Sequence, residues 1–232
     1  MDSRNFDYIK NIDTSRPPTF SLNLKGISKI SFINEFGPAN GLIAYYPLNT
    51  DAKDYSGYGN HGTVYGAIIT DGFGQNAYYF DGVDDYIIGS SNLGLSGDPE
   101  FTIAYWAIWN GDAFSSNYPS GVGNNSTGTT GQGLSTTWKD GRIALDFWNT
   151  RYRATQALSI KTWYHVAFVK TPGPVSTTCK IYVNGVEVAG ALENTDLTPN
   201  IVDSPIIIGR LDATRWFKGR IQDVRIYNRA LA

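Results

Sequence analysis

Two dipeptides, Asp140-Gly141 and Asn184-Gly185, constrain the fold more than any other feature of this sequence. Each lies between short runs that alternate apolar and polar residues, at positions 138–143 and 181–188. Asp-Gly and Asn-Gly tolerate the positive φ angles of a type I′ turn, whose twist matches that of two flanking antiparallel strands. The sequence therefore predicts two β-hairpins.

Further strand patterns follow one another at short intervals along the chain. We expect strands at residues 42–48, 77–81, 86–89, 101–109, 163–170, 206–209 and 217–227. No window keeps a 3.6-residue apolar period over the length of a helix, and aromatic residues, which suit pleated sheets, make up 14% of the chain. These patterns predict an all-β fold, a two-sheet antiparallel β-sandwich or jelly roll.

Two segments differ from this strand-rich pattern. Residues 1–40 contain an Arg16-Pro17-Pro18 break and two short apolar runs, and we interpret them as an N-terminal arm or anchoring segment before one domain at 41–232. The arm either packs on its own domain or fastens the protein to another subunit. Residues 110–133 are rich in Gly, Ser, Thr and Asn, so we expect a long loop, either a recognition surface or a flexible insertion.

Charge and cysteine content exclude several classes of protein. The net charge of −2 gives no electrostatic footprint for nucleic acid or an anionic membrane, so neither is expected as a partner. The single cysteine, Cys179, cannot form an internal disulfide, and its alternating apolar surroundings predict a small core residue. We expect no signal peptide and no transmembrane segment in this chain.

Four segments, in order, resemble laminin-G-like domains of the concanavalin A-like lectin/glucanase superfamily. The first is LIAYYPL at 42–48 followed by DYSGYGNHG at 54–62, and the second is YFDGVDDYI at 79–87. The third joins TWYHVA at 162–167 to IYVNG at 181–185, and the last is FKGRIQDVRIYNRAL at 217–231. The resemblance covers residues 41–232 and implies a concanavalin A-like jelly roll whose first and last strands are adjacent.

The resemblance also implies a structural Ca²⁺ between the turn at 54–62 and the last strand, where family members often hold one. Calcium prefers oxygen ligands from carboxylates, amides and backbone carbonyls. We expect Asp54, Asn60 and Asp223 as side-chain ligands, with backbone oxygens near Gly57 and Gly59. The alternative is that the polar side chains of the turn only stabilise it through hydrogen bonds.

Other acidic residues offer little support for catalysis. Glycoside hydrolysis, the enzymatic alternative, needs two carboxylates on opposite sides of the scissile bond. Hydrolases of the superfamily carry Glu-x-Asp-x-Glu along one strand, whereas none of the four glutamates here is so paired, and we place Glu193 in a loop. Asp81, Asp84 and Asp85 form a second acidic group that is more typical of a turn. We therefore expect no catalytic residues.

Aromatic side chains near turns and strand ends are candidates for stacking on sugar rings. The candidate ligand-binding residues are Trp138, Trp148, Asn149, Tyr152, Arg153 and Trp216, accompanied by Arg151 and Arg215. The alternative for each aromatic residue is a place in the core, which we expect for Trp106, Trp163 and Phe168.

The leading hypothesis is a non-catalytic, surface-displayed binding or adhesion module whose ligand is a glycan or a protein. The alternative is a structural component of a virion, such as a capsid or tail decoration protein, or of another assembly or homo-oligomer, anchored through residues 1–40. A chain without a signal peptide fits a virion component made in a cytoplasm. Both hypotheses place the domain at an extracellular or virion surface.

Overall fold

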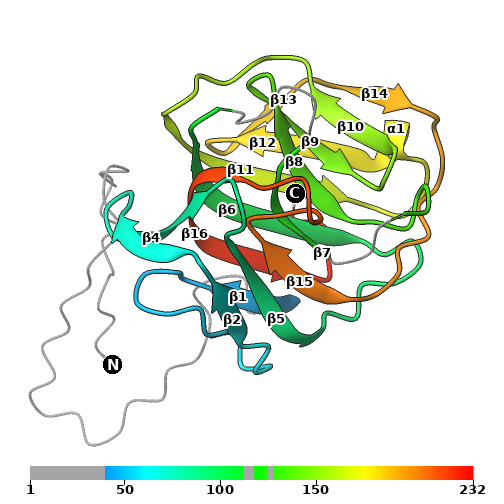
Figure 1. The fold of residues 1–232 in the computed structure, drawn as a ribbon. Coiled ribbons are helices and arrows are strands. Elements are labelled where there is room, and N and C mark those ends of the chain that lie inside the picture. The colour runs from blue at the N-terminus through cyan, green and yellow to red at the C-terminus, as the bar shows by residue number, and fades with distance from the viewer. Residues whose placement is uncertain (1–39, 112–117, 125–127, 232) are drawn as a thin grey trace, which may run out of the picture. The chain divides into compact units, whose positions relative to one another are not determined.

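The computed structural model of the chain describes residues 40–111, 118–124 and 128–231. In this part, two antiparallel sheets form a β-sandwich (Figure 1). One short helix, α1 (Val175–Thr178), is present among the described residues. No helix there has the length and apolar character that crossing a membrane requires. The predicted all-β sandwich is therefore confirmed.

Sheet A contains the strands that come first and last in the sequence of the sandwich domain. Its strands are β1 (Leu42–Tyr46), β3 (Ile68–Asp71), β4 (Asn76–Asp81), β6 (Phe101–Trp109), β11 (Trp163–Lys170), β12 (Cys179–Val183), β13 (Val186–Val188) and β16 (Lys218–Tyr227). They follow the order β13-β12-β11-β6-β16-β4-β3, and β1 also pairs with β16. The first and last strands are therefore adjacent, as the resemblance implied.

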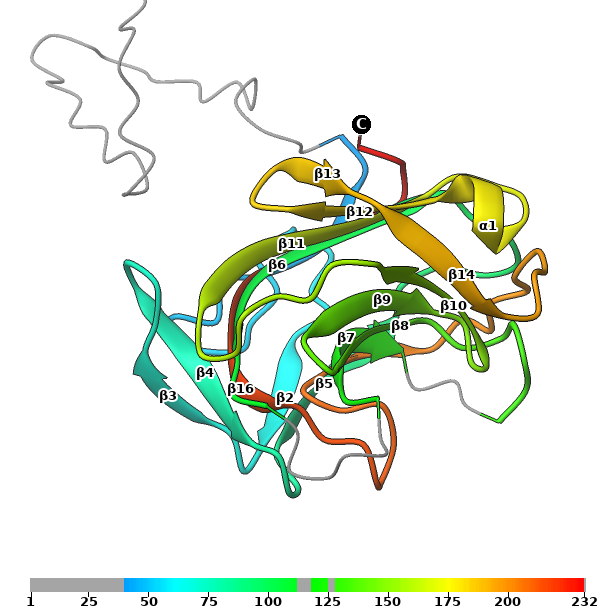
Figure 2. The same ribbon diagram turned by 90° about the horizontal axis from the view of Figure 1, so that it is seen from above.

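Sheet B forms the second layer. Its strands are β2 (Gly62–Tyr65), β5 (Tyr86–Asn92), β7 (Ser120–Asn124), β8 (Ser135–Lys139), β9 (Arg142–Asp146), β10 (Thr150–Ala154), β14 (Gly190–Asn194) and β15 (Pro205–Ile208). They follow the order β14-β10-β9-β8-β7-β15-β5-β2. Seen from above, β6 and β11 of sheet A lie in one layer and β8, β9 and β10 of sheet B in the other (Figure 2).

Both predicted hairpins are confirmed. The β8–β9 turn has φ angles of 52° at Asp140 and 72° at Gly141, and the β12–β13 turn has 50° at Asn184 and 79° at Gly185. Positive φ at both central residues is the mark of a type I′ turn, so the local chemistry of each dipeptide sets the hairpin.

Strand alternation decides which aromatic residues enter the core. In β6, Tyr105 is fully buried between the sheets, so its neighbour Trp106 faces outward. Phe73 stacks on Trp106 there, with ring centroids 4.6 Å apart. In β11, Phe168 is in the core as predicted, whereas Trp163 faces outward. The core prediction is thus wrong for Trp106 and Trp163, because both have the opposite parity to the residues of their strands that pack in the core cluster between the sheets.

The predicted loop at 110–133 is wrong in part, because it contains β7, an interior strand of sheet B between β15 and β8. Its glycines allow close packing: a Cβ at Gly121 would lie 2.5 Å from Tyr105 Oη, and one at Gly123 would lie 2.6 Å from the carbonyl oxygen of Leu134. Residues 112–117 and 125–127 of that loop, and the predicted arm up to residue 39, lie outside the described residues.

Candidate ligand-binding site on sheet B

Three charged side chains lie buried on the outward face of sheet B. Leu145 of β9 and Tyr152 of β10 pack against the core, so alternation turns Asp146, Arg151 and Arg153 to the other side of the sheet. The exposed fractions of these three residues are 2%, 8% and 9%. Charges buried to this extent need oppositely charged partners.

Those partners form a network across β9, β10 and β14. Arg151 Nε donates to Asp146 Oδ2 at 2.7 Å, and Arg151 Nη1 lies 3.6 Å from Glu193 Oε2. Arg153 Nη1 donates to Glu193 Oε1 at 2.8 Å. The expectation that Glu193 lies in a loop is wrong, because it pairs opposite Arg151 in β14. Burial raises the pKa of the Asp146 carboxyl, although the charge of Arg151 acts in the opposite direction.

The ring of Tyr118 covers this network. Arg151 Cζ lies 3.9 Å from the ring centroid, Lys139 Nζ 4.2 Å and Arg153 Cζ 5.9 Å. Cations at these distances from an aromatic face are attracted by its quadrupole. We call Tyr118, Lys139, Asp146, Arg151 and Arg153 the Tyr118 cluster.

A cavity of about 260 Å³ adjoins the Tyr118 cluster. It is lined by Thr130, Asp146, Trp148, Asn149, Arg151 and Arg215. Trp148 and Asn149 form the β9–β10 turn, with φ angles of 58° and 64°. Arg215 Cζ lies 4.5 Å from the Trp148 ring centroid. One cavity thus combines an indole ring with guanidinium, amide, hydroxyl and carboxylate groups.

Several buried polar atoms on this face have no hydrogen-bond partner in the part of the chain that the structure describes. They are Ser120 Oγ, Thr137 Oγ1, Asp146 Oδ1 and Arg153 Nε. A buried polar group without a partner costs about 1–3 kcal/mol. Asp146 also lines the cavity, although its Oδ1 atom has almost no exposed surface. The hydrogen-bonding groups of this face are therefore not all used within the sheet.

The structure brings together most of the predicted ligand-binding residues. Trp148, Asn149, Arg151 and Arg215 line the cavity, and Arg153 lies beside it in the Tyr118 cluster. The sequence interpretation missed four neighbours: Tyr118, Thr130, Lys139 and Asp146.

Three other predicted residues lie elsewhere. The expectation for Trp138 needs correction, since its side chain is 1% exposed and its Nε1 donates to Tyr105 Oη at 3.0 Å in the core. Tyr152 packs against the core from the opposite side of β10 to Arg151. Trp216 is half-buried outside the cavity lining, with its ring centroid 6.0 Å from that of Tyr86.

The turn predicted to bind calcium is held by the carboxylate of Asp54. Asp54 Oδ1 accepts hydrogen bonds from the backbone N–H groups of Tyr45 at 2.9 Å and Ser56 at 2.8 Å, and Oδ2 accepts from that of Asn60 at 3.0 Å. Burial raises the pKa of Asp54, but hydrogen bonds from Ser56, Tyr45 and Asn60 outweigh it and bring the pKa below its ordinary value. Gly57 and Gly59 have φ angles of 98° and 77°.

The other predicted calcium ligands are also engaged. Asn60 Oδ1 accepts a hydrogen bond from Ser91 Oγ, and Asp223 Oδ1 accepts from Arg225 Nε at 3.1 Å. An arginine beside Asp223 opposes a second cation there. The side chains as arranged do not fit a free set of calcium ligands, and their hydrogen bonds support the turn-stabilising alternative. The sequence-based prediction of calcium binding is therefore set against this alternative, and a stability measurement with and without calcium decides between them.

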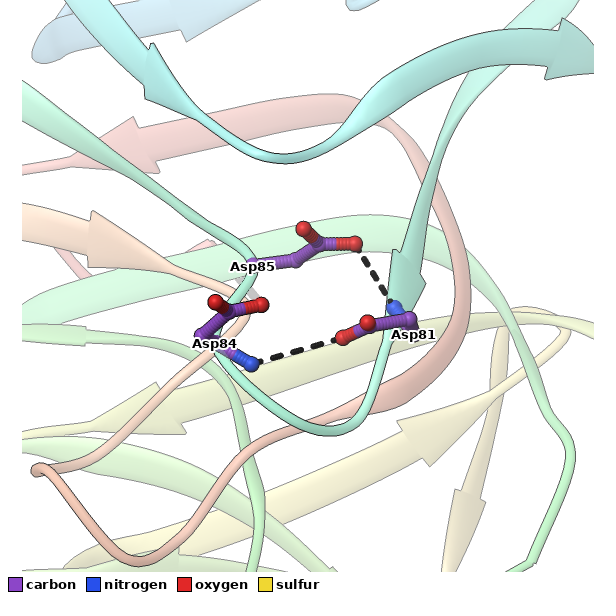
Figure 3. A group of neighbouring side chains, drawn as sticks. All are labelled: Asp81, Asp84 and Asp85. Carbon is purple, nitrogen blue, oxygen red and sulfur yellow. Dashed lines mark hydrogen bonds between the residues drawn. The ribbon is translucent and has the colours of Figure 1, made fainter.

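The second acidic group lies at the β4–β5 turn (Figure 3). The ligand atoms of Asp81, Asp84 and Asp85 lie within 4.8 Å of one another. Asp85 Oδ2 accepts from the backbone N–H of Asp81 at 2.8 Å, and Asp81 Oδ1 accepts from those of Val83 at 2.7 Å and Asp84 at 3.4 Å. These bonds within the turn agree with the structural role expected from the sequence.

Comparison with known proteins agrees with this fold. Residues 80–232 match a family described as the concanavalin A-like lectin/glucanases superfamily. No curated protein matches the chain. Among solved structures, domain 4 of AbnA, a GH43 extracellular arabinanase from Geobacillus stearothermophilus in complex with arabinotriose, has a TM-score of 0.57 and 20% identity. The match covers 82% of this chain and 94% of that domain.

Two further proteins share the fold, with similar TM-scores and sequence identities. The binding domain of Paraclostridial Mosquitocidal Protein 1 has a TM-score of 0.59 and 19% identity, and covers 84% of this chain. Botulinum neurotoxin type C, whose cell entry depends on two ganglioside molecules, has a TM-score of 0.58 and 16% identity over 84% of this chain. The chain spans 50% and 49% of these two structures. At these identities the likeness shows the fold alone.

Proposed function

Because the chain belongs to the concanavalin A-like lectin/glucanase superfamily, we propose that it is a non-catalytic binding module whose ligand is a glycan. The observation that carries this proposal is the cavity beside the Tyr118 cluster, where Trp148 and Arg215 meet the buried pair of Asp146 and Arg151. We further propose that the module is displayed on an extracellular or virion surface.

The chemistry of the cavity suits a sugar. A pyranose or furanose ring has an apolar C–H face, which packs on an aromatic side chain, and hydroxyl groups that both donate and accept hydrogen bonds. Trp148 supplies the aromatic wall, Asn149 and Arg215 supply donors, and the Thr130 hydroxyl and the Asn149 amide oxygen supply acceptors. The arabinotriose complex of AbnA domain 4 supports a glycan as ligand class on the same fold.

The two carboxylates of the site are arranged for binding rather than hydrolysis. Asp146 and Glu193 both contact Arg151, at 2.7 Å and 3.6 Å. A glycosidase holds the scissile bond between its carboxyl groups and keeps one of them protonated to act as the acid. Here the guanidinium group of Arg151 contacts both carboxylates, so an arginine rather than a scissile bond engages the two groups. This arrangement supports a binding module.

The test is a glycan array probed with the full chain, followed by calorimetry on the strongest ligand. Trp148→Ala is expected to weaken binding about tenfold or more, since aromatic anchors dominate the affinity of small sites. Trp163→Ala is the matched control, because Trp163 is a half-buried tryptophan on the outward face of sheet A. Flat signal across the array, or equal losses in the two variants, would overturn the proposal.

A further inference from the structure

Arg210 follows β15 and lies close to two neighbouring aromatic rings. Its Cζ atom is 3.6 Å from the ring centroid of Tyr86 and 5.4 Å from that of Trp216. Tyr65 extends the stack on the far side of Tyr86, with centroids 4.5 Å apart and planes within 6° of parallel. We call Tyr65, Tyr86, Arg210 and Trp216 the Arg210 cluster.

The fold places this cluster on the same face as the cavity. Ile87 enters the core, so Tyr86 and its cross-strand partner Tyr65 point outward from sheet B, as Arg151 does. Arg210 and Trp216 pair across the base of the 210–216 turn. The same turn carries Arg215, which lines the cavity. One short segment therefore connects the cavity to the Arg210 cluster.

Arg210 differs from its neighbouring arginines, because it has no acidic partner in the part of the chain that the structure describes. The other arginines near the cavity form ion pairs with carboxylates: Arg151 with Asp146, Arg153 with Glu193 and Arg215 with Asp212. Among the described residues, no carboxylate forms an ion pair with Arg210, and its buried Nε has no hydrogen-bond partner. Because Nε is buried, the positive charge and the two Nη groups of Arg210 are what remain for a ligand.

We propose that the glycan bound by this module carries an acidic group, a carboxylate or a sulfate, and that Arg210 binds it. The inference rests on the proposed function, since the acidic group belongs to the same ligand. A guanidinium group binds carboxylate and sulfate oxygens through parallel, charge-assisted hydrogen bonds. The two rings hold its plane in position before the ligand arrives, which reduces the entropy that binding removes.

The test compares acidic oligosaccharides with their neutral parents. The full chain is titrated by calorimetry with sialyllactose against lactose, with sulfated lactose against lactose, and with tetragalacturonate against its fully methylated ester. For at least one pair, the acidic member is expected to bind about 10–100-fold more tightly. Arg210→Gln is expected to remove that preference and to leave the affinity for the neutral parent unchanged.

The control is Arg220→Gln, because Arg220 also lies over a tyrosine, with its Cζ 5.9 Å from the ring centroid of Tyr79, but on sheet A. It should keep the full preference for the acidic member. Equal binding of acidic and neutral members, or an unchanged preference in Arg210→Gln, overturns the acidic-ligand proposal while glycan binding stands. Absence of binding to any glycan overturns the proposed function as well. The wild-type comparison tests the acidic class of ligand even if the variant fails to fold.

Discussion

The ammonium group of Lys170 is fully buried and forms an ion pair with the carboxylate of Asp98, 72 positions earlier in the chain. Lys170 Nζ also donates to the carbonyl oxygens of Thr171 at 2.8 Å and Gly173 at 3.3 Å, and Asp98 Oδ2 accepts from the N–H of Gly173 at 2.7 Å. The pair ties the segment before β6 to the last residue of β11, and the Gly173 bond ties it to the residues that follow. It stabilises this end of the sandwich through groups that are fully hydrogen-bonded.

Replacing Lys170 by methionine should destabilise the fold strongly. The substitution keeps the length of the side chain but leaves Asp98 without its charge partner, and breaking a buried pair from one side costs about 3–5 kcal/mol. Urea denaturation measures the free energy of unfolding. Lys180→Met is the control, since Lys180 pairs with Glu187 at the surface. A similar loss in both variants would show that the buried pair has no special role.

The contribution of Asp54 should depend on pH. The pKa of Asp54 is lower in the folded chain than in the unfolded chain, where it is about 3.9. Its stabilising effect is therefore complete above the unfolded pKa and is lost as the pH falls through the folded one. Asp54→Ala should lower the free energy of unfolding by about 2–4 kcal/mol at neutral pH, because it removes the acceptor of three backbone hydrogen bonds.

Thermal unfolding of wild type and Asp54→Ala from neutral to acidic pH measures this effect. The difference in Tm should shrink as the pH falls. Asp71→Ala, at an exposed position of β3, should match wild type at every pH. A difference that stays constant with pH would contradict the assigned role of the Asp54 charge.

Calcium should leave the thermal stability of the full chain unchanged. Both oxygens of Asp54 already accept backbone hydrogen bonds, and Asp223 is paired with Arg225. Calorimetric scans with calcium and with a chelator test this expectation. A Tm that rises with calcium in wild type but not in Asp54→Asn would instead establish the predicted metal site.

Cys179 should be inert in the folded protein. Burial raises the pKa of its thiol to about 12, so the reactive thiolate is scarce at neutral pH. A thiol-specific disulfide reagent should therefore label the chain only after denaturant is added. Cys179→Ser provides the blank. Rapid labelling of the native chain would show that the strand end around Cys179 opens readily.

The strands that sequence alone predicted best are those with bulky alternating residues. The predicted bounds of Phe101–Trp109 and Trp163–Lys170 agree with the structure because apolar parity marks the buried face. Strand β7 was missed because Ser120–Asn124 contains only one apolar side chain. Its glycines pack against residues of other strands and loops, such as Tyr105 and Leu134, and a local sequence pattern does not show these contacts.

The alternation of residues along a strand predicts which side chains share a face of the sheet, and residue type alone does not. Tyr152 alternates with Arg151 and Arg153, so it could not share their face, and Asp146 has the parity opposite to the bulky core residues Ile143 and Leu145 of β9. The place of Tyr118 in the site could not be predicted, for a different reason. It meets Arg151 only through the order of strands in sheet B, which no local pattern reveals.

The position of β16 has a consequence for how the protein is made. Strands β4 and β3 on one side, and β1, join sheet A only through β16. On a translating ribosome, β1, β3 and β4 emerge long before β16. They therefore remain without this partner strand until it has been made. Sheet A can therefore close only when residues 218–227 have left the exit tunnel, and until then its unpaired strand edges need protection from aggregation.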